Sequence, residues 1–457
     1  MKKLLTLPSF PQYRIDLLHQ VMDIHLYEEE MLFALLLLGR PELSIVYMSS
    51  VPISQPLVDY YLRLLPDPED AWRRLTLISL NDARPLPLVT KLSLRPDVMR
   101  LLDQELASHA AYLFPFEVTA DEWAVAKALQ IPVFGPPPKL VRIGTKSGSR
   151  RAAHAAGVPV LDGAGDLRSM LDVARELDHL HERRPNLRAA VVKLNRGFGG
   201  QGNAVIDLYA VPSPLKDADA TSRDASWWES FGQQVLDEGA IIEEYVDEPG
   251  AAFPSVQLRI GLKGIVDIIS SHDQLLAGAE KQEYVGARFP AGDRYRCRIE
   301  GEALKVGHLV GSKGMVGMFG IDFIAIPYQS GYKLYLDEIN LRVTATLRHF
   351  LTATAVTEGQ YNSAAGRITT RSGPRVYVAA DNLCSDKFRG QPEQLLAALR
   401  DQDLAYAKQS RTGVVLHLLG ALTEFGRFGA TCIGDSPERA ESMYRGVLEL
   451  ADARTGR

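Results

Sequence analysis

The polar residues between Asp337 and Arg342 are spaced as a cation site would require. The stretch has the sequence Asp-Glu-Ile-Asn-Leu-Arg. Side chains on a strand alternate between its two faces, so Glu338, Asn340 and Arg342 share one face while the apolar residues share the other. Asp322 lies shortly upstream, in Gly-Ile-Asp-Phe. Arg342 can neutralise a phosphate or an oxyanion close to this polar row.

Residues 328–333, Tyr-Gln-Ser-Gly-Tyr-Lys, predict a hairpin turn between the two stretches. If the hairpin is symmetric about Ser330, Asp322 lies opposite Glu338, with Cβ atoms about 4.5–5.5 Å apart. Two carboxylates at that separation repel unless a cation joins them, and Mg²⁺ prefers hard oxygen ligands. We therefore predict a magnesium site formed by Asp322, Glu338 and Asn340. The alternative is a solvated strand face with ordinary charge pairs.

A second candidate site is the glycine-rich turn 196–202, Arg-Gly-Phe-Gly-Gly-Gln-Gly. It satisfies the dinucleotide fingerprint G-x-G-x-x-G, but that motif needs a following helix and residues 203–208 favour a strand. An oxidoreductase would require residues 203–215 to be helical. A strand–loop–strand unit is instead a hairpin, whose backbone N–H groups can lie over phosphates. Rather than a flexible surface hairpin, we predict phosphate binding by Lys193, Gly197, Phe198, Gly199, Gly200 and Gly202.

Other polar residues beside apolar strands are further candidates. Arg259 shares a strand face with Gln257, and this inward position would let it bind a substrate carboxylate or a γ-phosphate. An arginine bridging two strands is the alternative. His272 and Asp273 follow an apolar strand and could orient an acid or accept a proton from an amine, although a histidine at a strand end is more often structural. Arg288 has the same two interpretations.

The elements that would position these residues follow from hydrophobic periodicity. Over the first 130 residues, predicted strands at 43–51 and 74–80 alternate with predicted helices at 57–65 and 97–108. This alternation indicates a parallel α/β layer. The apolar run 31–38 predicts a buried helix, since a bilayer span needs about 20 residues. Residues 145–157 predict a capped helix, and 211–226 an exposed loop. Further segments are the strands 188–194, 240–246, 255–260, 264–270, 318–326 and 332–341 and the helices 301–313 and 436–452.

Composition limits the class of protein. At about 100–200 residues per domain, 457 residues predict two to four domains. The net charge of −5 provides no basic excess for nucleic acid. Cys297, Cys384 and Cys432 are far apart, which predicts reduced thiols in a cytoplasmic protein. Neither a signal peptide nor a membrane-spanning run is expected.

These residues together resemble the ATP-grasp superfamily, whose members bind ATP between two α+β subdomains. The resemblance implies that Lys146 and Lys193 bind the phosphates and that Glu243 lies at the hinge that holds the adenine. It implies the same magnesium ligands as the hairpin and gives Arg342 the role of catalytic arginine. The nucleotide-binding residues are then Lys146, Lys193, Glu243, Glu244, Tyr245 and Val246, together with the glycine turn.

A closer resemblance is to the peptide ligases similar to the one in pheganomycin biosynthesis. It rests on 254–259, 271–274, 288–291, 338–342 and 412–420. In those ligases, the segment that corresponds to 338–342 is usually followed by a glycine- and threonine-rich stretch ending in His-Pro. This chain instead has Val-Thr-Ala-Thr-Leu-Arg-His-Phe from Val343 to Phe350, a region expected to border the acyl acceptor. The candidate catalytic residues are Arg342, Lys193, Arg259 and His272. The candidate substrate-binding residues are Arg259, Ser271, His272, Asp273, Arg288 and Arg342.

The resemblance implies an ATP-grasp fold of α/β and α+β class. A Rossmann-like pre-ATP-grasp domain would span 1–130, the ATP-grasp core 131–370 and a C-terminal α+β region 371–457. The implied enzyme is an ATP-dependent carboxylate–amine ligase that forms an amide bond through an acyl phosphate and releases ADP and phosphate, in small-peptide or natural-product biosynthesis.

The expected cofactors and partners follow from this activity. The ligase would use ATP with one or two Mg²⁺ ions, or Mn²⁺ instead. It would join a small acid to an amine, an amino acid or a peptide, and would be a homodimer by default. Neither nucleic acid nor a membrane is expected as a partner. An amidine-forming ligase, a small-molecule kinase and a catalytically silent nucleotide-binding subunit are the alternatives.

Overall fold

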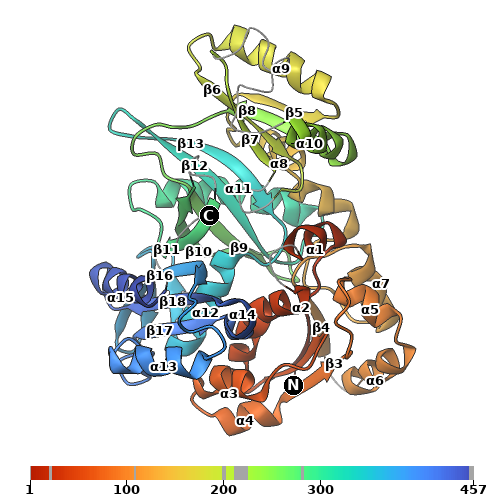
Figure 1. Cartoon of the computed structure of the whole chain (residues 1–457), viewed down its shortest axis with the longest axis vertical. Coiled ribbons are helices and arrows are strands. Elements are labelled where there is room, and N and C mark those ends of the chain that lie inside the picture. Colours follow the sequence, from red (N-terminus) through yellow and green to blue (C-terminus); the bar gives the residue numbers. More distant parts are fainter. Residues whose placement is uncertain are drawn as a thin grey trace.

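The computed structural model describes residues 2–19, 23–107, 110–197, 202–209, 225–278 and 283–451. They form three β-sheets with helices around them. In Figure 1 a sheet near the N-terminus lies at one end of the molecule, a small sheet lies at the other end, and the largest sheet lies between them. None of the helices in these ranges is long and apolar enough to cross a membrane.

The N-terminal sheet is parallel, with strand order β3-β2-β1-β4. The predicted parallel α/β layer is therefore confirmed. The strand β1 was not predicted, because its first residues are lysines; Lys3 is buried while its Nζ lies 2.9 Å from Glu105 Oε1. The elements of this layer are β1 (Lys2–Leu7), α1 (Gln12–Leu18), α2 (Ile24–Tyr27), β2 (Leu43–Ser49), α3 (Gln55–Arg63), α4 (Pro68–Arg73), β3 (Leu75–Ser79), α5 (Leu88–Ser93), α6 (Pro96–Leu106), β4 (Ala110–Pro115) and α7 (Ala120–Ala128).

The apolar run 31–38 is buried as predicted, but it forms a 3₁₀ helix, η1 (Glu28–Gly39). Its residues share one apolar core with helix α12 (Ala345–Thr357) and with C-terminal strands. The N-terminal layer is thereby joined to the end of the chain by apolar burial, which stabilises in proportion to the area removed from water.

Glu28, the first residue of η1, is a buried carboxyl whose ionisation should make stability depend on pH. It is 4% exposed and accepts hydrogen bonds from the Ser50 amide at 2.7 Å and the Ser50 hydroxyl at 2.5 Å. Burial raises the pKa of Glu28 from 4.5 to about 7, although Ser50 and Lys91 lower it. The folded state therefore holds this proton more tightly than the unfolded chain does. This stabilisation is complete below about pH 4.5 and is lost as the pH rises through about 7.

We expect Glu28→Gln to flatten the fall of the thermal midpoint between these two pH values. Thermal melts of the variant and the parent protein across the window measure the effect. The matched control is Glu182→Gln, at an exposed position of helix α9 (Met170–Arg183), which should keep the parent slope. Equal slopes for the parent protein and Glu28→Gln would show that Glu28 does not hold its proton.

The small sheet is antiparallel, with strand order β5-β8-β6-β7. The predicted helix 145–157 is α8 (Lys146–Ala156), capped by the Thr145 side chain and ended by Gly157 in the left-handed region. The predicted loop 211–226 lies outside the described residues except for its last two, which begin α10. The elements of this part are η2 (Pro138–Gly144), α8, β5 (Gly163–Leu167), α9, β6 (Ala189–Leu194), β7 (Asn203–Asp207), α10 (Ala225–Glu238) and β8 (Ala240–Glu244).

The largest sheet has ten strands, and its paired neighbours run antiparallel. Its main order is β13-β12-β9-β10-β11-β16-β15-β14, and β18 joins β17 to β16. Helix α11 packs on one face, over a core that contains Ile299, Val306 and Phe319. The elements are β9 (Pro254–Ile260), β10 (Val266–Ala277), β11 (Glu283–Phe289), α11 (Arg296–Ser312), β12 (Gly317–Tyr328), β13 (Gly331–Asn340), α12, β14 (Gln360–Asn362), β15 (Arg367–Thr370), β16 (Gly373–Cys384), α13 (Pro392–Asp401), β17 (Gly413–His417), α14 (Leu419–Phe425), β18 (Arg427–Gly434) and α15 (Pro437–Leu450).

The predicted domain boundaries at 130 and 370 stay a prediction. Strand β16 begins just after the second boundary and pairs with β11, so residues beyond 370 extend the largest sheet. The three cysteines are free, as expected.

Candidate active site

The β12–β13 hairpin places the predicted carboxylates opposite each other. Asp322 pairs with Glu338, and Gly320 pairs with Asn340. The amide nitrogen of Asn340 donates a hydrogen bond to Asp322 Oδ2 at 2.8 Å. This leaves the amide oxygen of Asn340 as the atom able to ligate a cation. The predicted pairing is therefore confirmed at the three residues proposed to bind magnesium. The predicted symmetry about Ser330 is wrong, because Tyr328 pairs with Gly331 and the register shifts by one residue before Asp322.

A β-bulge brings a further carboxylate into this site. Phe323 pairs with Leu336, whereas the preceding residue Asp322 pairs with Glu338, so Asp337 is the extra residue of β13. A bulge interrupts the alternation of side chains and re-aims the extra residue. Asp337 Oδ1 lies 2.7 Å from Lys193 Nζ. The sequence carried no signal for this contact, since simple alternation places Asp337 on the face opposite Glu338.

Helix α8 delivers Lys146 to the hairpin. Lys146 is the first residue of the helix, and its Nζ lies 3.3 Å from Glu338 Oε1 and 3.0 Å from the carbonyl oxygen of Gly197. The helix is fixed to β13 because the Ile339 amide donates to the Ser149 hydroxyl at 2.9 Å. Lys146 is 6% exposed. The nucleotide lysine implied by resemblance thus lies between the glycine turn and the carboxylates.

The position of α8 depends on Gly148, where side-chain atoms have no room. A Cβ at Gly148 would lie 1.9 Å from the carbonyl oxygen of Arg142. We expect Gly148→Ala to lower the free energy of unfolding by about 1–3 kcal/mol, as other overpacked sites do, and to displace Lys146. The control is Gly301→Ala in α11, where a Cβ meets no atom within 4 Å; it should stabilise by about 1 kcal/mol. Thermal midpoints that shift in the same direction for both variants would contradict this account.

Lys193, on β6, is held by two carboxylates. Its Nζ lies 2.7 Å from Asp337 and 3.1 Å from Glu243. Burial acts to lower the pKa of Lys193, but Asp337 and Glu243 outweigh it and raise the pKa above the usual range. Glu243 is 1% exposed and also lies 2.5 Å from Arg150 Nη1. Arg150 lies one helical turn beyond Lys146, and this i, i+4 spacing in the predicted helix is the sequence signal that places both side chains on one face.

The hinge residues implied by resemblance lie at the end of β8 and just after it. The carboxylate of Glu243 is engaged by Arg150 and Lys193, so contact with an adenine there would use backbone atoms. Glu244 is paired with Arg184 at 2.9 Å. Tyr245 and Val246 follow and are half-buried, with the Tyr245 amide donating to Ala189. Their role with adenine stays a prediction.

The glycine turn connects two antiparallel strands, β6 and β7, with Lys193 opposite Asn203. Residues 203–207 form a strand, so the dinucleotide alternative is excluded. Gly197 and Gly202 lie at the two ends of the turn, where the Leu194 amide donates to the Gly202 carbonyl at 2.9 Å. Phe198, Gly199 and Gly200 lie outside the described residues, and their contact with phosphates stays a prediction.

The donors at the hairpin fit a divalent cation. Burial raises the pKa of Asp322 to about 7, and the charges of Glu338 and Asp337 add to this effect, while a Ser255 hydrogen bond opposes it. Carboxylates gathered in this way are stabilised as anions only by nearby positive charge. Two carboxylates and an amide oxygen are the oxygen ligands that Mg²⁺ takes in phosphate-binding sites.

Comparison with known proteins shows which group has this arrangement. The family described as IQCH-like, ATP-grasp matches residues 211–364, and the PGM1 C-terminal domain matches residues 394–447. L-propargylglycine–L-glutamate ligase of Streptantibioticus cattleyicolor is 29% identical over 429 residues, which cover 90% of this chain and 86% of that ligase. Biotin carboxylase from Campylobacter jejuni has a TM-score of 0.60 at 13% identity, covering 99% of this chain and 91% of its own. The chain has the ATP-grasp fold, and its middle part matches an ATP-grasp family.

A second solved structure supports the same fold for this ATP-grasp protein. N5-carboxyaminoimidazole ribonucleotide synthetase from Thermus thermophilus has a TM-score of 0.56 at 15% identity, and each chain is covered completely, at 100%. The predicted fold class is therefore confirmed. The parallel N-terminal sheet and the small antiparallel sheet correspond to the expected pre-ATP-grasp layer and ATP-grasp subdomain.

Arg342, the arginine of the ATP-grasp Glu-x-Asn-x-Arg pattern, lies just beyond β13. Its side chain is 18% exposed, and its Nε lies 3.8 Å from Glu117 Oε2. Nη1 donates a long hydrogen bond of 3.5 Å to the carbonyl of Val343. Burial lowers the pKa of Arg342, and Arg14 adds to this, whereas Glu117 and Glu338 act to raise it. The arginine therefore belongs to the same charged cluster as the predicted magnesium ligands.

The departure from the peptide-ligase pattern at 343–350 forms the start of α12. The Thr344 side chain caps this helix and donates to Gln257 Oε1 at 2.8 Å. Arg348 and His349 are 2% and 0% exposed and bind Asp381 within the core. Arg348 and His349 therefore stabilise the core. The residues of this segment next to Arg342 stay candidates to border the acyl acceptor.

Arg259 is not inward-facing, and this prediction is corrected. Its side chain is 49% exposed, and its Nη2 lies 2.8 Å from Asp267 Oδ2 on the neighbouring strand β10. Gln257 lies on the same strand face and is buried, with Thr344 hydrogen-bonded to it. Arg259, two residues further along the strand, is not covered in this way. The structure shows the alternative interpretation, an arginine that bridges two strands.

His272 is a core histidine, which corrects its catalytic interpretation. It is 0% exposed, and its Nε2 lies 2.6 Å from the Tyr377 hydroxyl. Burial lowers the pKa of His272 to about 3, with a further contribution from His349. The ring is 5.5 Å from that of Phe289. A neutral histidine sealed among aromatic rings does not reach a substrate.

The neighbours of His272 also have structural partners. Ser271 is buried and donates to Glu300 at 3.0 Å. Asp273 accepts hydrogen bonds from the Gly292 amide at 3.0 Å and the Tyr295 hydroxyl at 2.7 Å, which fixes the segment leading into α11. Arg288 is exposed and paired with Glu441. The predicted substrate residues of β10 and β11 therefore have structural partners, although the sheet register places His272 two strands from Asp322, with Ser255 between them.

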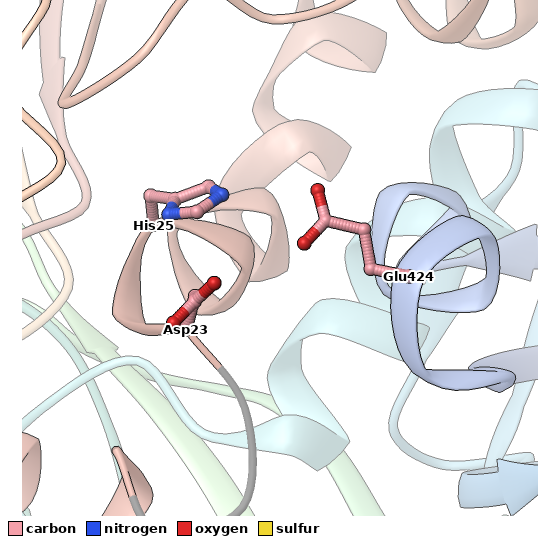
Figure 2. A group of neighbouring side chains, drawn as sticks. All are labelled: Asp23, His25 and Glu424. Atoms are coloured by element: carbon pink, nitrogen blue, oxygen red, sulfur yellow. The ribbon is translucent and has the colours of Figure 1, made fainter.

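A separate group of metal-ligand types lies between α2 and α14. Figure 2 shows Asp23 and His25 beside Glu424, with the three side chains gathered in one place. Their ligand atoms lie within 4.8 Å of one another. Both carboxylates are exposed, so water can satisfy them without an ion. We assign this group no part in the ATP-grasp site.

Proposed function

We propose that this ATP-grasp protein is an ATP-dependent ligase that joins the carboxylate of a small acid to an amine. The observation that carries the proposal is the convergence of Lys146, Lys193, Asp322 and Glu338, from three separate parts of the fold, beside Arg342. Such a cluster suits the transfer of a phosphoryl group to a carboxylate. The ligase from S. cattleyicolor, similar over most of both chains, supports amide formation.

The side chains of the site would divide the chemistry as follows. Lys146 and Lys193 would bind the phosphates of ATP, and the hairpin carboxylates with Asn340 would hold Mg²⁺. When bound, Mg²⁺ neutralises charge on the phosphate oxygens. A carboxylate oxygen of the acid attacks the γ-phosphorus, and the bond to the bridging oxygen of ADP breaks. The amine nitrogen then attacks the acyl carbon, loses a proton and expels phosphate, while Arg342 stabilises the oxyanion.

Amino acids are the substrate class that we propose to test first. The S. cattleyicolor relative is named for L-propargylglycine and L-glutamate as the pair it joins. That pair and its close analogues form the starting panel, together with small peptides as amine donors. We also propose a cytoplasmic location and one or two Mg²⁺ ions for each site.

A pairwise screen of acids against amines tests the proposal. ADP release that requires both substrates, together with a product whose mass equals acid plus amine minus water, is the expected result. Release of AMP and pyrophosphate would exclude the scheme. A stable phosphorylated product would identify a kinase instead. Nucleotide binding by calorimetry without turnover on the panel would favour a silent nucleotide-binding subunit.

A further inference from the structure

The N-terminal layer contributes an arginine to the neighbourhood of Arg342. Helix α1 carries Tyr13 and Arg14, and the Arg14 side chain is only 8% exposed. Arg14 Nε lies 2.9 Å from Glu117 Oε2, and the Tyr13 hydroxyl donates to Glu117 Oε1 at 2.8 Å. Both oxygens of Glu117 are thus used to fix α1, far in sequence from the ATP-grasp hairpin.

Glu117 links this helix to the candidate active site. The oxygen that pairs with Arg14 also lies 3.8 Å from Arg342 Nε. One carboxylate is therefore shared by two guanidinium groups. The contact to Arg342 is longer than a hydrogen bond, and the bond of Arg342 to the Val343 carbonyl is 3.5 Å. The guanidinium of Arg342 has five donors, so these two long contacts leave binding capacity for an anion.

The same helix also contacts the start of the glycine turn. The guanidinium of Arg196 lies 5.5 Å from the centre of the Tyr13 ring, within the range of a cation–π contact. Tyr13 is thus placed between the phosphate-binding turn and Glu117. The charge of Glu338 also acts on both Arg14 and Arg342, but the proposed function assigns Glu338 to Mg²⁺. Glu117 alone then balances one of the two guanidinium charges, and an anionic ligand would balance the other.

We infer that Arg14, together with Arg342, binds the carboxylate of the acid substrate, and that Glu117 and Tyr13 hold Arg14 in place for it. This inference rests on the proposed function, because it assigns the acid site of that reaction. Arg342 is next to Asn340 and Glu338, so a carboxylate on this pair lies beside the predicted magnesium site. Arg14 is then a substrate-binding residue supplied by the N-terminal layer.

Kinetics with the acid–amine pair found in the screen test the assignment. Loss of a charge-assisted hydrogen bond should raise the KM for the acid about 10- to 100-fold in Arg14→Gln. The KM for ATP should stay unchanged. Arg14→Lys keeps the charge but loses the planar fork, so its KM for the acid should lie between those of the parent protein and Arg14→Gln. The control is Arg100→Gln, which changes an exposed arginine on helix α6 of the same layer. This variant should have the same KM for the acid as the parent protein. An unchanged KM for the acid in a folded Arg14→Gln overturns the inference while the function stands.

A binding measurement separates failure of this inference from failure of the proposed function. Thermal melts with Mg²⁺ and a non-hydrolysable ATP analogue compare sodium acetate with sodium chloride at equal ionic strength. Acetate should raise the midpoint of the parent protein and of Arg100→Gln, but not of Arg14→Gln. Equal protection of all three, or of none, overturns the inference. Selective protection without any turnover in the screen would instead reject the ligase and retain the carboxylate site.

Discussion

Glu338→Gln is expected to lower the rate of acid- and amine-dependent ADP release by at least about a hundredfold, while the fold is retained. Removing one charged ligand weakens the binding of Mg²⁺ and with it the stabilisation of phosphate charge. Metal ions provide several kcal/mol of such stabilisation, and each ~1.4 kcal/mol is a factor of ten in rate. Glutamine also gives up the 3.3 Å ion pair that Glu338 forms with Lys146.

The measurement is a coupled ADP assay with saturating ATP, repeated over a range of Mg²⁺ concentrations. Part of the lost rate should return at high Mg²⁺, because a weaker site can still be filled by mass action. Asp267→Asn is the matched control, since this carboxylate lies on the same sheet but is 43% exposed and faces Arg259. The assignment fails if Glu338→Gln turns over at nearly the parent rate, or if Asp267→Asn loses as much.

Arg348→Met is expected to cause the largest loss of stability among single substitutions in the core. Arg348 is 2% exposed and bonded to Asp381, and its Nη1 lies 2.7 Å from Glu30 Oε2. Although burial acts to raise the pKa of Asp381, Arg348 and His349 hold it well below its usual range. Removing the arginine leaves a buried, uncompensated carboxylate. Breaking such a pair costs about 3–5 kcal/mol.

A double-variant cycle checks this explanation. Arg348→Met combined with Asp381→Asn should unfold at a higher temperature than Arg348→Met alone, because the orphaned charge is gone. The control, Arg439→Met, removes an exposed pair with Asp435 and should leave the midpoint nearly unchanged. If the double variant is no more stable than Arg348→Met, lost packing rather than the buried charge explains the effect.

The buried network around Asp381 also includes a second histidine. His417 lies in an apolar run, and its Nε2 lies 2.7 Å from the Thr431 hydroxyl, which also bonds His349 at 2.7 Å. His417 is therefore a satisfied core histidine. His272 has the same character, but its neighbours in the sequence, Ser271 and Asp273, suggested chemistry. Identical residue types thus cannot be assigned without knowing what covers them.

Local patterns in the sequence determined those parts of the site that neighbouring residues specify. A short turn between two strand-forming segments was enough to identify the β12–β13 hairpin, although the predicted pairing of Asp322 with Glu338 also required the bulge at Asp337. A strand-forming segment after the glycines was likewise enough to identify the second hairpin. The caps of α8 were also visible, because Thr145 and Gly157 act on the backbone beside them. These features depend on interactions that span only a few residues.

Tertiary structure alone decided which side chains meet. The bulge that turns Asp337 toward Lys193 depends on how β12 and β13 pair, so the sequence of β13 alone does not predict it. The exposure of Arg259 depends on where the cover over its sheet ends. The approach of Arg14 to Arg342 joins helices and strands far apart in the chain through Glu117. Burial and charge pairing arise from packing between distant segments, and a sequence pattern describes only the segment that contains it.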